Sequence, residues 1–246
     1  NIPPRCKLII LPNAACLSEE EAARIRDFVK NGGNIISTFE TSLYSEAGYK
    51  YDNFQLSDVF GAENPAEVFG PLNWDYLTPS DIEHFSTNKI NQKYLYAPSY
   101  GLITKAKSNA PVMFCKPLPG SYSGSPVVSE HPFLIDNSYG KGKSLYLAGT
   151  FGSSLNRFHF PEYYMLLFNM VSNLSNQVLK TENVPSSVEV NLRQKGNSIY
   201  LYLINFTSEM RRPIQRIIPV SDLKLHLLLN KPVRDIRALW SGKNLE

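Results

Sequence analysis

Apolar and polar positions change period within the first forty residues. Residues 7–12, KLIILP, form a continuous apolar run, which is typical of a parallel strand buried on both faces. Ser18 and the three glutamates after it predict a capped helix start. Apolar residues then recur at helical spacing, at Ala22, Ile25, Phe28 and Val29. Gly32-Gly33 ends this helix, and residues 34–40 are the next predicted strand, which makes a βαβ unit.

The pattern is irregular from about residue 42 to residue 125, where Tyr, Asn, Ser and Pro are frequent. A short helix is expected around residues 55–60, and short strands are expected in KYLYAPSYGLITKA and APVMFCKPL. GSYSGSPVV is interpreted as a mobile loop. The aromatic side chains here would either line a surface groove or fix an insertion to the core, and the second interpretation is favoured.

Regular patterns return with KSLYLAG, residues 143–149, which predicts another buried strand. Pro161 opens a helix whose apolar face closes the first domain. SVEVNLRQKGNSIYLYLINFT alternates around a Lys-Gly-Asn turn and predicts an antiparallel hairpin, with two further strands in DLKLHLLLN and VRDIRALWSG. We therefore expect one α/β domain over residues 1–180 and a small all-β, sandwich-like domain over residues 186–246.

Composition removes several classes of function. The chain is 43% hydrophobic and 19% charged, with a net charge of +3, and it has no basic stripe, so nucleic acid is not an expected partner. No apolar stretch approaches the roughly 20 residues of a membrane helix, so no membrane partner is expected. The opening residues resemble neither a signal peptide nor a transit sequence, which leaves cytoplasm and periplasm open.

The residues that commonly bind metals or form disulfides follow no recognisable spacing. Cys6, Cys16 and Cys115 are an odd set without a CxxC pair, and the four histidines are scattered along the chain. The sequence thus calls for no disulfide framework, no metal and no cofactor.

Cys16 lies near a strand-to-helix turn, where nucleophiles are often placed. A nucleophile elbow needs small residues on both sides, yet Leu17 and Ser18 follow this cysteine and no glycine flanks it. No His-x-Glu pair follows that could activate the thiol. We expect Cys16 to be a packed loop thiol rather than a catalytic residue.

Glu40 follows a predicted strand, at the end where open α/β sheets usually bind ligands. The favoured interpretation is that its carboxylate caps a loop by accepting backbone N–H groups. Thr41 and Ser42 would either hydrogen-bond this carboxylate or cap the segment that follows. Glycoside cleavage would need a second carboxylate roughly 5 to 10 Å away. Several carboxylates have the required chemistry, and the sequence pairs none of them with Glu40: Glu46, Asp52, Glu67 and Asp75.

Three strings together resemble a known family: LIILPNAACLSEEEAARIRDFVKNGGNIISTFETSLY, GKGKSLYLAGTFG and PEYYMLLFNMVSNL. They are similar to the trimerisation (middle) domain of family 42 β-galactosidases and related bacterial glycoside hydrolases, over roughly residues 5–178. The resemblance implies a flavodoxin-like, class I glutamine-amidotransferase-like fold, an α/β three-layer arrangement around a parallel sheet. The segment after residue 186 is similar to the small β domain that ends such enzymes.

The sequence departs from this family and its relatives in three ways. The resemblance places the family's catalytic carboxylates on a (β/α)₈ barrel, which we do not expect in these residues. It also leads us to expect that the first strands and helices of the middle domain are missing and that the sheet is N-terminally incomplete. The Cys-His-Glu triad of the amidotransferase relatives is absent as well. A sheet without its first strands would expose an edge that recruits another chain.

The resemblance therefore implies a non-catalytic oligomerisation and accessory portion of a glycoside hydrolase, which frames a sugar site supplied by the barrel. We expect a homo-oligomer, either a dimer or a trimer, with an oligosaccharide as the further partner. The alternatives are a stand-alone carbohydrate-binding protein and a degenerate amidotransferase-like hydrolase that uses Cys16. No catalytic residue is assigned, and the residues expected to contact sugar or a neighbouring subunit are Glu40, Tyr44, Asn73, Trp74 and Tyr76.

Overall fold

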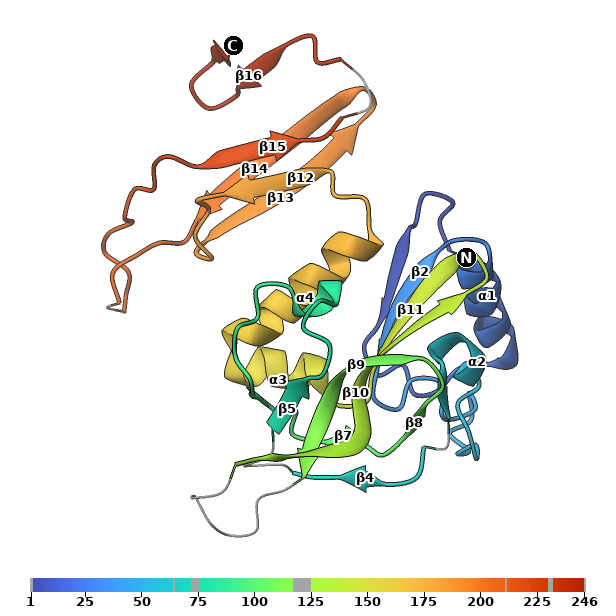
Figure 1. The fold of residues 1–246 in the computed structure, drawn as a ribbon. Coiled ribbons are helices and arrows are strands. Elements are labelled where there is room, and N and C mark those ends of the chain that lie inside the picture. Colours follow the sequence, from blue (N-terminus) through green and yellow to red (C-terminus); the bar gives the residue numbers. More distant parts are fainter. Residues whose placement is uncertain are drawn as a thin grey trace. The chain divides into compact units, whose positions relative to one another are not determined.

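The computed structural model describes residues 2–63, 65–71, 76–116, 125–210, 212–229 and 232–245 (Figure 1). The chain divides into two compact units, Asn1–Asn176 and Gln177–Glu246, and each is described by itself. None of the helices in the described ranges has the length and hydropathy needed to cross a membrane.

A mixed β-sheet is the centre of the first unit (Figure 1). In the described part of the chain its neighbouring strands are, in order, β1 (Leu8–Leu11), β2 (Asn34–Thr38), β11 (Gly142–Leu147), β10 (Val127–Tyr139), β9 (Asn109–Lys116), β5 (Tyr76–Pro79) and β6 (Leu95–Tyr96). β1, β2 and β11 run parallel, and each later neighbour is antiparallel to the one before it. The unit is therefore mixed α/β, and the expected parallel pairing holds only for the first three strands.

The antiparallel half of the sheet depends on β10, which the sequence analysis did not predict. The loop interpretation of GSYSGSPVV was wrong for Val127 and Val128, which begin β10, and residues 120–124 of that string lie outside the described residues. This strand spans 13 residues, and its register against β9 shifts at Pro132 and Leu134, so side chains do not alternate regularly along it. It returns into β11 through a tight turn at Gly140, whose φ is +61°. The hairpin makes β11 antiparallel to β10 and parallel to β2, which converts the sheet from parallel to antiparallel pairing at this point.

β1 is the first edge of the sheet. It pairs with β2 from Leu8↔Asn34 to Leu11↔Ser37, as a βαβ unit requires. Burial on both faces was expected for this strand, but 46% of Ile10 is exposed. The expectation was wrong because an edge strand is covered less completely than β2, where Ile35 and Ile36 are both buried.

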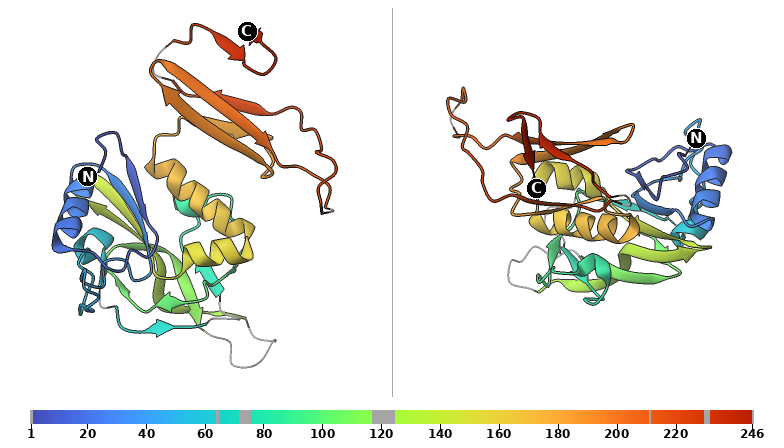
Figure 2. Two further views of the ribbon diagram at one scale, coloured as in Figure 1. Left: turned by 180° about the vertical axis from the view of Figure 1, so that it is seen from behind. Right: turned by 90° about the horizontal axis from the view of Figure 1, so that it is seen from above.

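Local sequence explains where the helices begin and end. α1 (Glu19–Lys30) starts with a capping box in which Ser18 and Glu21 bond each other's backbone N–H, and α2 (Ser57–Phe60) ends at left-handed Gly61. α4 (Pro161–Leu174) has proline in its first turn. Two short helical elements were not predicted: the 3₁₀ turn η1 (Phe85–Thr87) and α3 (Phe151–Phe158). Figure 2 shows α3 and α4 side by side.

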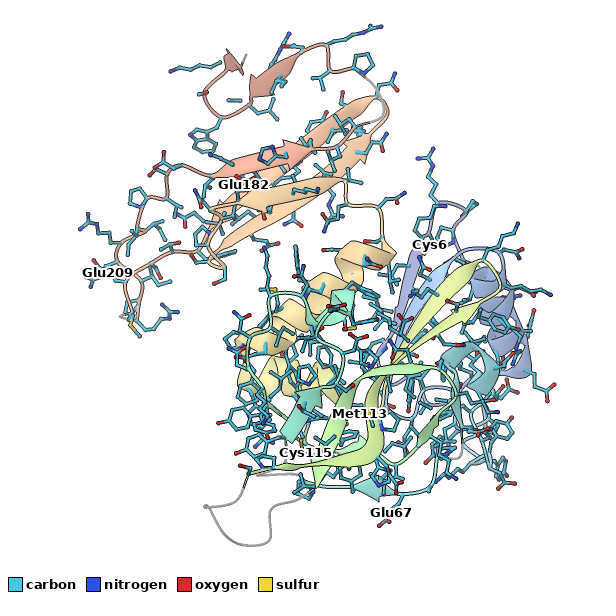
Figure 3. The ribbon with its side chains drawn as sticks, viewed as in Figure 1. Cys6, Glu67, Met113, Cys115, Glu182 and Glu209 are labelled. Atoms are coloured by element: carbon cyan, nitrogen blue, oxygen red, sulfur yellow. The ribbon has the colours of Figure 1, made fainter. Side chains whose placement is uncertain are left out.

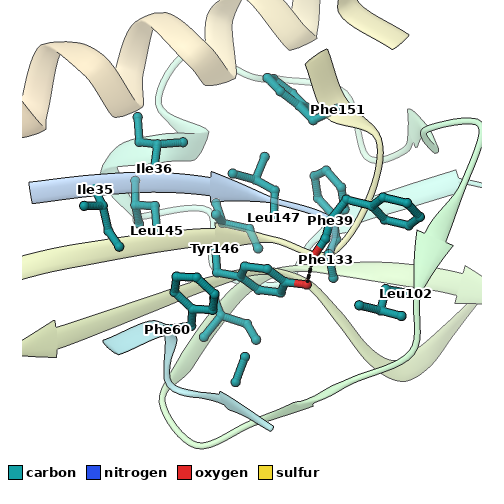
Figure 4. Close-up of a cluster of buried hydrophobic side chains, with 14 of the residues drawn as sticks. Ile35, Ile36, Phe39, Phe60, Leu102, Phe133, Leu145, Tyr146, Leu147 and Phe151 are labelled. Atoms are coloured by element: carbon teal, nitrogen blue, oxygen red, sulfur yellow. Dashed lines mark hydrogen bonds between the residues drawn. The ribbon is translucent and has the colours of Figure 1, made fainter. Parts of the chain in front are cut away.

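Helices cover both faces of the central strands. Figure 4 shows Phe60 of α2 on one side of β11 and Phe151 of α3 on the other. Tyr146 of β11 is fully buried, and its ring stacks on Phe60 with centroids 5.0 Å apart. Its hydroxyl donates a hydrogen bond of 2.5 Å to the Phe39 carbonyl, so the one polar atom of this side chain is satisfied in the core.

Short ribbons surround the sheet in the irregular region: β3 (Ala62–Glu63) pairs with β8 (Lys105–Ala106), and β4 (Val68–Phe69) pairs with β7 (Gly101–Leu102). Cys6 precedes β1 and Cys115 lies in β9, on well separated parts of the unit (Figure 3). Within the described residues, none of Cys6, Cys16 and Cys115 forms a disulfide.

Strands and loops make up the described part of the second unit. The predicted hairpin is present as β13 (Val188–Lys195) and β14 (Ser198–Asn205), in register from Val188↔Asn205 to Lys195↔Ser198. β12 (Leu179–Glu182) pairs with β15 (Lys224–Leu227), and β16 (Ile236–Ala238) pairs with β17 (Lys243–Leu245). Over the described residues these strands pair two by two.

Candidate functional site

Glu40 and Tyr44 lie in the loop that follows β2, at the end of the parallel strands. Phe39 adopts a left-handed conformation with φ +53°, which turns the chain out of the sheet. The Tyr44 hydroxyl donates a hydrogen bond of 3.0 Å to Glu40 Oε1, and both side chains are half-buried. The Glu40 backbone N–H donates to Asn13 Oδ1 at 3.2 Å, which ties this loop to the end of β1.

The role expected for the Glu40 carboxylate was wrong in its details. Its bonding partner is a phenol rather than a backbone N–H. Thr41 Oγ1 donates to the carbonyls of Leu11 and Thr38, and Ser42 Oγ accepts from the backbone of Leu56. Burial raises the pKa of Tyr44, and the hydrogen bond to Glu40 raises it further, so the hydroxyl remains a donor at neutral pH.

Cys16 is part of the same loop cluster. Its segment is joined to the Glu40 loop by backbone hydrogen bonds, including Tyr44 N–H to Ala15 and Leu17 N–H to Tyr44. The thiol is exposed, so the expectation of a packed thiol was wrong, because the loop of Cys16 lies at the surface. Across the described residues no hydrogen bond joins it to a histidine. In the described part of the chain, no histidine is thus positioned to activate this thiol.

Tyr76 lies far from Glu40 in the sheet, because β11, β10 and β9 separate β2 from β5. The structure therefore does not bring the predicted contact residues into one site. Glu40 and Tyr44 form one location and Tyr76 another. Asn73 and Trp74 lie outside the described residues.

Tyr76 belongs to a row of five aromatic rings, which we call the aromatic ladder: Tyr94, Tyr76, Tyr96, Phe160 and Phe158. The centroid of Tyr76 is 6.1 Å from that of Tyr94 and 5.8 Å from that of Tyr96. Tyr96 stacks on Phe160 at 4.7 Å, and Phe160 stacks on Phe158 at 5.4 Å. The ladder joins the β6 edge of the sheet to the loop between α3 and α4.

Both ends of the aromatic ladder carry a cation. The Lys93 ammonium lies 5.1 Å from the centroid of Tyr94, and the Arg157 guanidinium lies 5.1 Å from that of Phe158. The ladder is open to solvent at two of its rings, since 51% of Tyr96 and 42% of Phe158 are exposed, and its other three rings are half-buried.

Sequence reasoning named Tyr76 but missed its partners. Tyr94 and Tyr96 are two residues apart, and so are Phe158 and Phe160. In an extended chain this spacing places both rings of a pair on one face, so the signal was present in KYLYAP. That the two pairs meet depends on the tertiary structure.

A hollow of about 310 Å³ lies between α4 and the loop after η1. Its wall includes Lys89, Tyr164 and Phe168, and Asn169 forms part of its floor. The Asn169 side-chain amide donates to the carbonyls of Ser86 and Asn88, at 2.9 and 2.7 Å, which fixes the loop to the helix.

A buried polar network that the sequence did not predict lies behind this loop. His84 Nε2 is 2.8 Å from Asp136 Oδ2, the Lys143 ammonium donates to the same oxygen at 2.7 Å, and His84 Nδ1 is 2.7 Å from Ser86 Oγ. The hydrogen bonds link Ser86 to His84 and His84 to Asp136, an arrangement that resembles the catalytic triad of a hydrolase. Ser86, however, is fully buried. Since no substrate can reach Ser86, the network fixes structure. His84 and Asp136 are 52 residues apart, and no local pattern links them.

Metal ligands do not gather in the described ranges, where no group of three or more His, Cys, Asp or Glu side chains is placed to hold an ion. The structure thus has two candidate contact places. One is the loop with Glu40 and Tyr44 at the end of β2, and the other is the aromatic ladder at the β6 edge of the sheet.

Comparisons with known proteins agree with this architecture. The β-galactosidase GalA of Bacillus licheniformis is 26% identical over 220 residues, which cover 88% of this chain and 29% of GalA. Gan42B, a GH42 β-galactosidase from G. stearothermophilus, has a similar fold, with a TM-score of 0.62 and 22% identity over 97% of this chain and 29% of its own. An α-L-fucosidase isoenzyme from Paenibacillus thiaminolyticus also has a TM-score of 0.62, at 15% identity over 91% of this chain and 34% of its own.

The chain thus spans 29 to 34% of the length of these relatives. A profile of one family, described as the β-galactosidase trimerisation domain, matches residues 4–167, which is well over half of the chain. This chain therefore belongs to the β-galactosidase trimerisation domain family.

Proposed function

We propose that this chain is the non-catalytic oligomerisation and accessory portion of a bacterial glycoside hydrolase of the β-galactosidase type. The observation that carries the proposal is the match of residues 4–167 to a trimerisation domain. The expected assembly is a homo-oligomer, a dimer or a trimer. The solvent-open aromatic ladder supports this role, because exposed apolar patches on a soluble unit commonly mark contact surfaces.

The finer part of the proposal is that the chain frames a sugar site supplied by a (β/α)₈ barrel outside this sequence. The chain corresponds to 29% of GalA, so a complete relative has room for such a barrel. The corner formed by Glu40 and Tyr44 is the part proposed to face sugar or a neighbouring subunit, since it lies where parallel strands end. Its carboxylate retains a second oxygen that could accept a sugar hydroxyl.

Light scattering coupled to size-exclusion chromatography tests the oligomerisation role. The chain has a mass of 27.8 kDa, and the expected particle has two or three times that mass. A mass of one chain at all loadings up to tens of micromolar would contradict the proposal.

Calorimetry tests the sugar-framing role. Galactose- and fucose-containing oligosaccharides are both needed as probes, because the relatives include a β-galactosidase and an α-L-fucosidase. The chain alone is expected to release no heat, since one rim of a site provides few contacts. Clear binding heat would instead support the alternative of a stand-alone carbohydrate-binding protein.

A further inference from the structure

We propose that the aromatic ladder and the adjoining outer face of α4 form the surface on which a second copy of this chain docks. This inference rests on the proposed oligomerisation and adds which face is used and how it pairs.

The surface is continuous from the sheet edge to the helix. Phe160 stacks on Tyr96 and is also the residue that precedes α4. Along α4, Tyr164 and Phe168 follow one turn apart, and 48% and 62% of these side chains are exposed. Together with exposed Phe158, these two side chains extend the apolar surface from β6 along α4. Tyr164 and Phe168 also line the 310 Å³ hollow, which has room for a side chain of the partner.

The geometry of the ladder favours a protein partner over a sugar. A pyranose binds an aromatic side chain by laying its C–H groups on a free ring face. Tyr96 and Phe160 each have two near-parallel ring neighbours, which leaves less of their ring faces free for a sugar. Phe158 has Phe160 on one side and the Arg157 guanidinium near its ring. The exposed parts of these stacked rings can pack against apolar side chains of a protein partner.

The charges around the surface indicate how two copies pair. Lys89, Lys93 and Arg157 are exposed along its rim, whereas the acidic side chain in the first turn of α4 is the half-buried Glu162. A two-fold dimer would place this face against itself and bring the cations together. The repulsion favours a heterologous contact, in which the ladder of one copy meets a different face of the next copy. A heterologous contact whose rotation closes gives a ring, and a trimer is the ring that the family description names.

The test replaces exposed residues of this surface by aspartate. Phe158→Asp and Phe168→Asp are each expected to raise the dissociation constant of the oligomer at least tenfold, measured by sedimentation equilibrium. Val68→Asp is the matched control, because 41% of Val68 is exposed and it lies in β4, outside both the aromatic ladder and the loop of Glu40 and Tyr44. Far-UV circular dichroism and thermal melting of each variant verify that the fold is retained.

The outcomes separate this inference from the proposed function. If the unmodified chain is monomeric, the proposed function fails and the inference fails with it. If the unmodified chain is oligomeric and folded Phe158→Asp and Phe168→Asp retain its dissociation constant, the docking face is wrong while oligomerisation stands.

Arg157→Glu tests the pairing mode. A heterologous contact made by the cationic rim predicts a dissociation constant at least tenfold higher in this variant. An unchanged or lower constant would overturn the heterologous arrangement, because in a self-paired face the reversed charge relieves repulsion.

Discussion

His84 Nε2 lies 2.8 Å from Asp136 Oδ2, and each of these side chains is only 8% exposed. The contact joins the segment before η1 to the middle of β10. Through the backbone of Ser86 and the side chain of Asn169, it also connects to α4. One buried carboxylate therefore holds together the sheet and the loop that borders the proposed docking surface.

The first prediction concerns the charge of this carboxylate. Asp136→Asn removes the charge that pairs with Lys143, and we expect a loss of about 2 to 3 kcal/mol in the free energy of unfolding, because breaking a buried pair leaves its partner uncompensated. Urea titration followed by far-UV circular dichroism measures this loss.

Asp58→Asn is the matched control for that variant. The Asp58 side chain pairs with Arg26 but is 45% exposed, so its loss is expected to cost about 1 kcal/mol or less. Equal losses in both variants would show that the buried network has no special role in stability.

The second prediction is a pH dependence that follows from the same group. Burial alone would raise the pKa of Asp136, but the hydrogen bonds from His84 and Lys143 outweigh it and hold the pKa below its ordinary value of 3.8. A carboxyl whose pKa is lower in the folded state than in the unfolded state stabilises the fold at pH values above its unfolded-state pKa. This stabilisation is lost as the pH falls through the folded-state pKa. The difference in unfolding free energy between the unmodified chain and Asp136→Asn should thus have its full size at pH 7. It should shrink as the pH falls below about 4. A constant difference down to pH 3 would contradict this.

The third prediction concerns two glycines with opposite surroundings. A Cβ on Gly142 would overlap the backbone carbonyl oxygens of Gly33 and Val29, neither of which can move aside without disturbing α1 and β2. Gly142→Ala should therefore lower the free energy of unfolding by roughly 3 kcal/mol or more, as overpacking does at its upper range.

Gly152 serves as the comparison, since a Cβ there meets nothing within 4 Å and the residue lies in α3. Gly152→Ala should be neutral or stabilise by about 0.5 kcal/mol. A Gly142→Ala chain as stable as the unmodified chain would show that the β11–α1 contact is looser than described.

The fourth prediction tests the hydrogen bond in the core. Tyr146→Phe keeps the buried ring but leaves the carbonyl of Phe39 without its donor, so the expected loss is about 1 to 2 kcal/mol. Tyr49→Phe removes an exposed hydroxyl and should change stability by less than about 0.5 kcal/mol. Indistinguishable urea midpoints for the two variants would argue against a bond that contributes to stability.

Local features of the sequence predicted part of this molecule correctly. Ser18 and Glu21 form the expected capping box, and the Lys-Gly-Asn turn connects the expected hairpin in the second unit. The strings around α1 and β11 identified the family that the profile match confirms. These features involve residues close in sequence, or a family pattern, so the sequence alone contains the information.

Only the tertiary structure decided the rest. β10 was missed because its bulged register hides the alternation, and with it the change from parallel to antiparallel pairing was missed. His84 meets Asp136, and Tyr96 meets Phe160, across 52 and 64 residues of chain. Which distant side chains become neighbours depends on strand order and on how helices pack over the sheet. That arrangement comes from burying the whole apolar surface at once, so no single segment of the sequence specifies it.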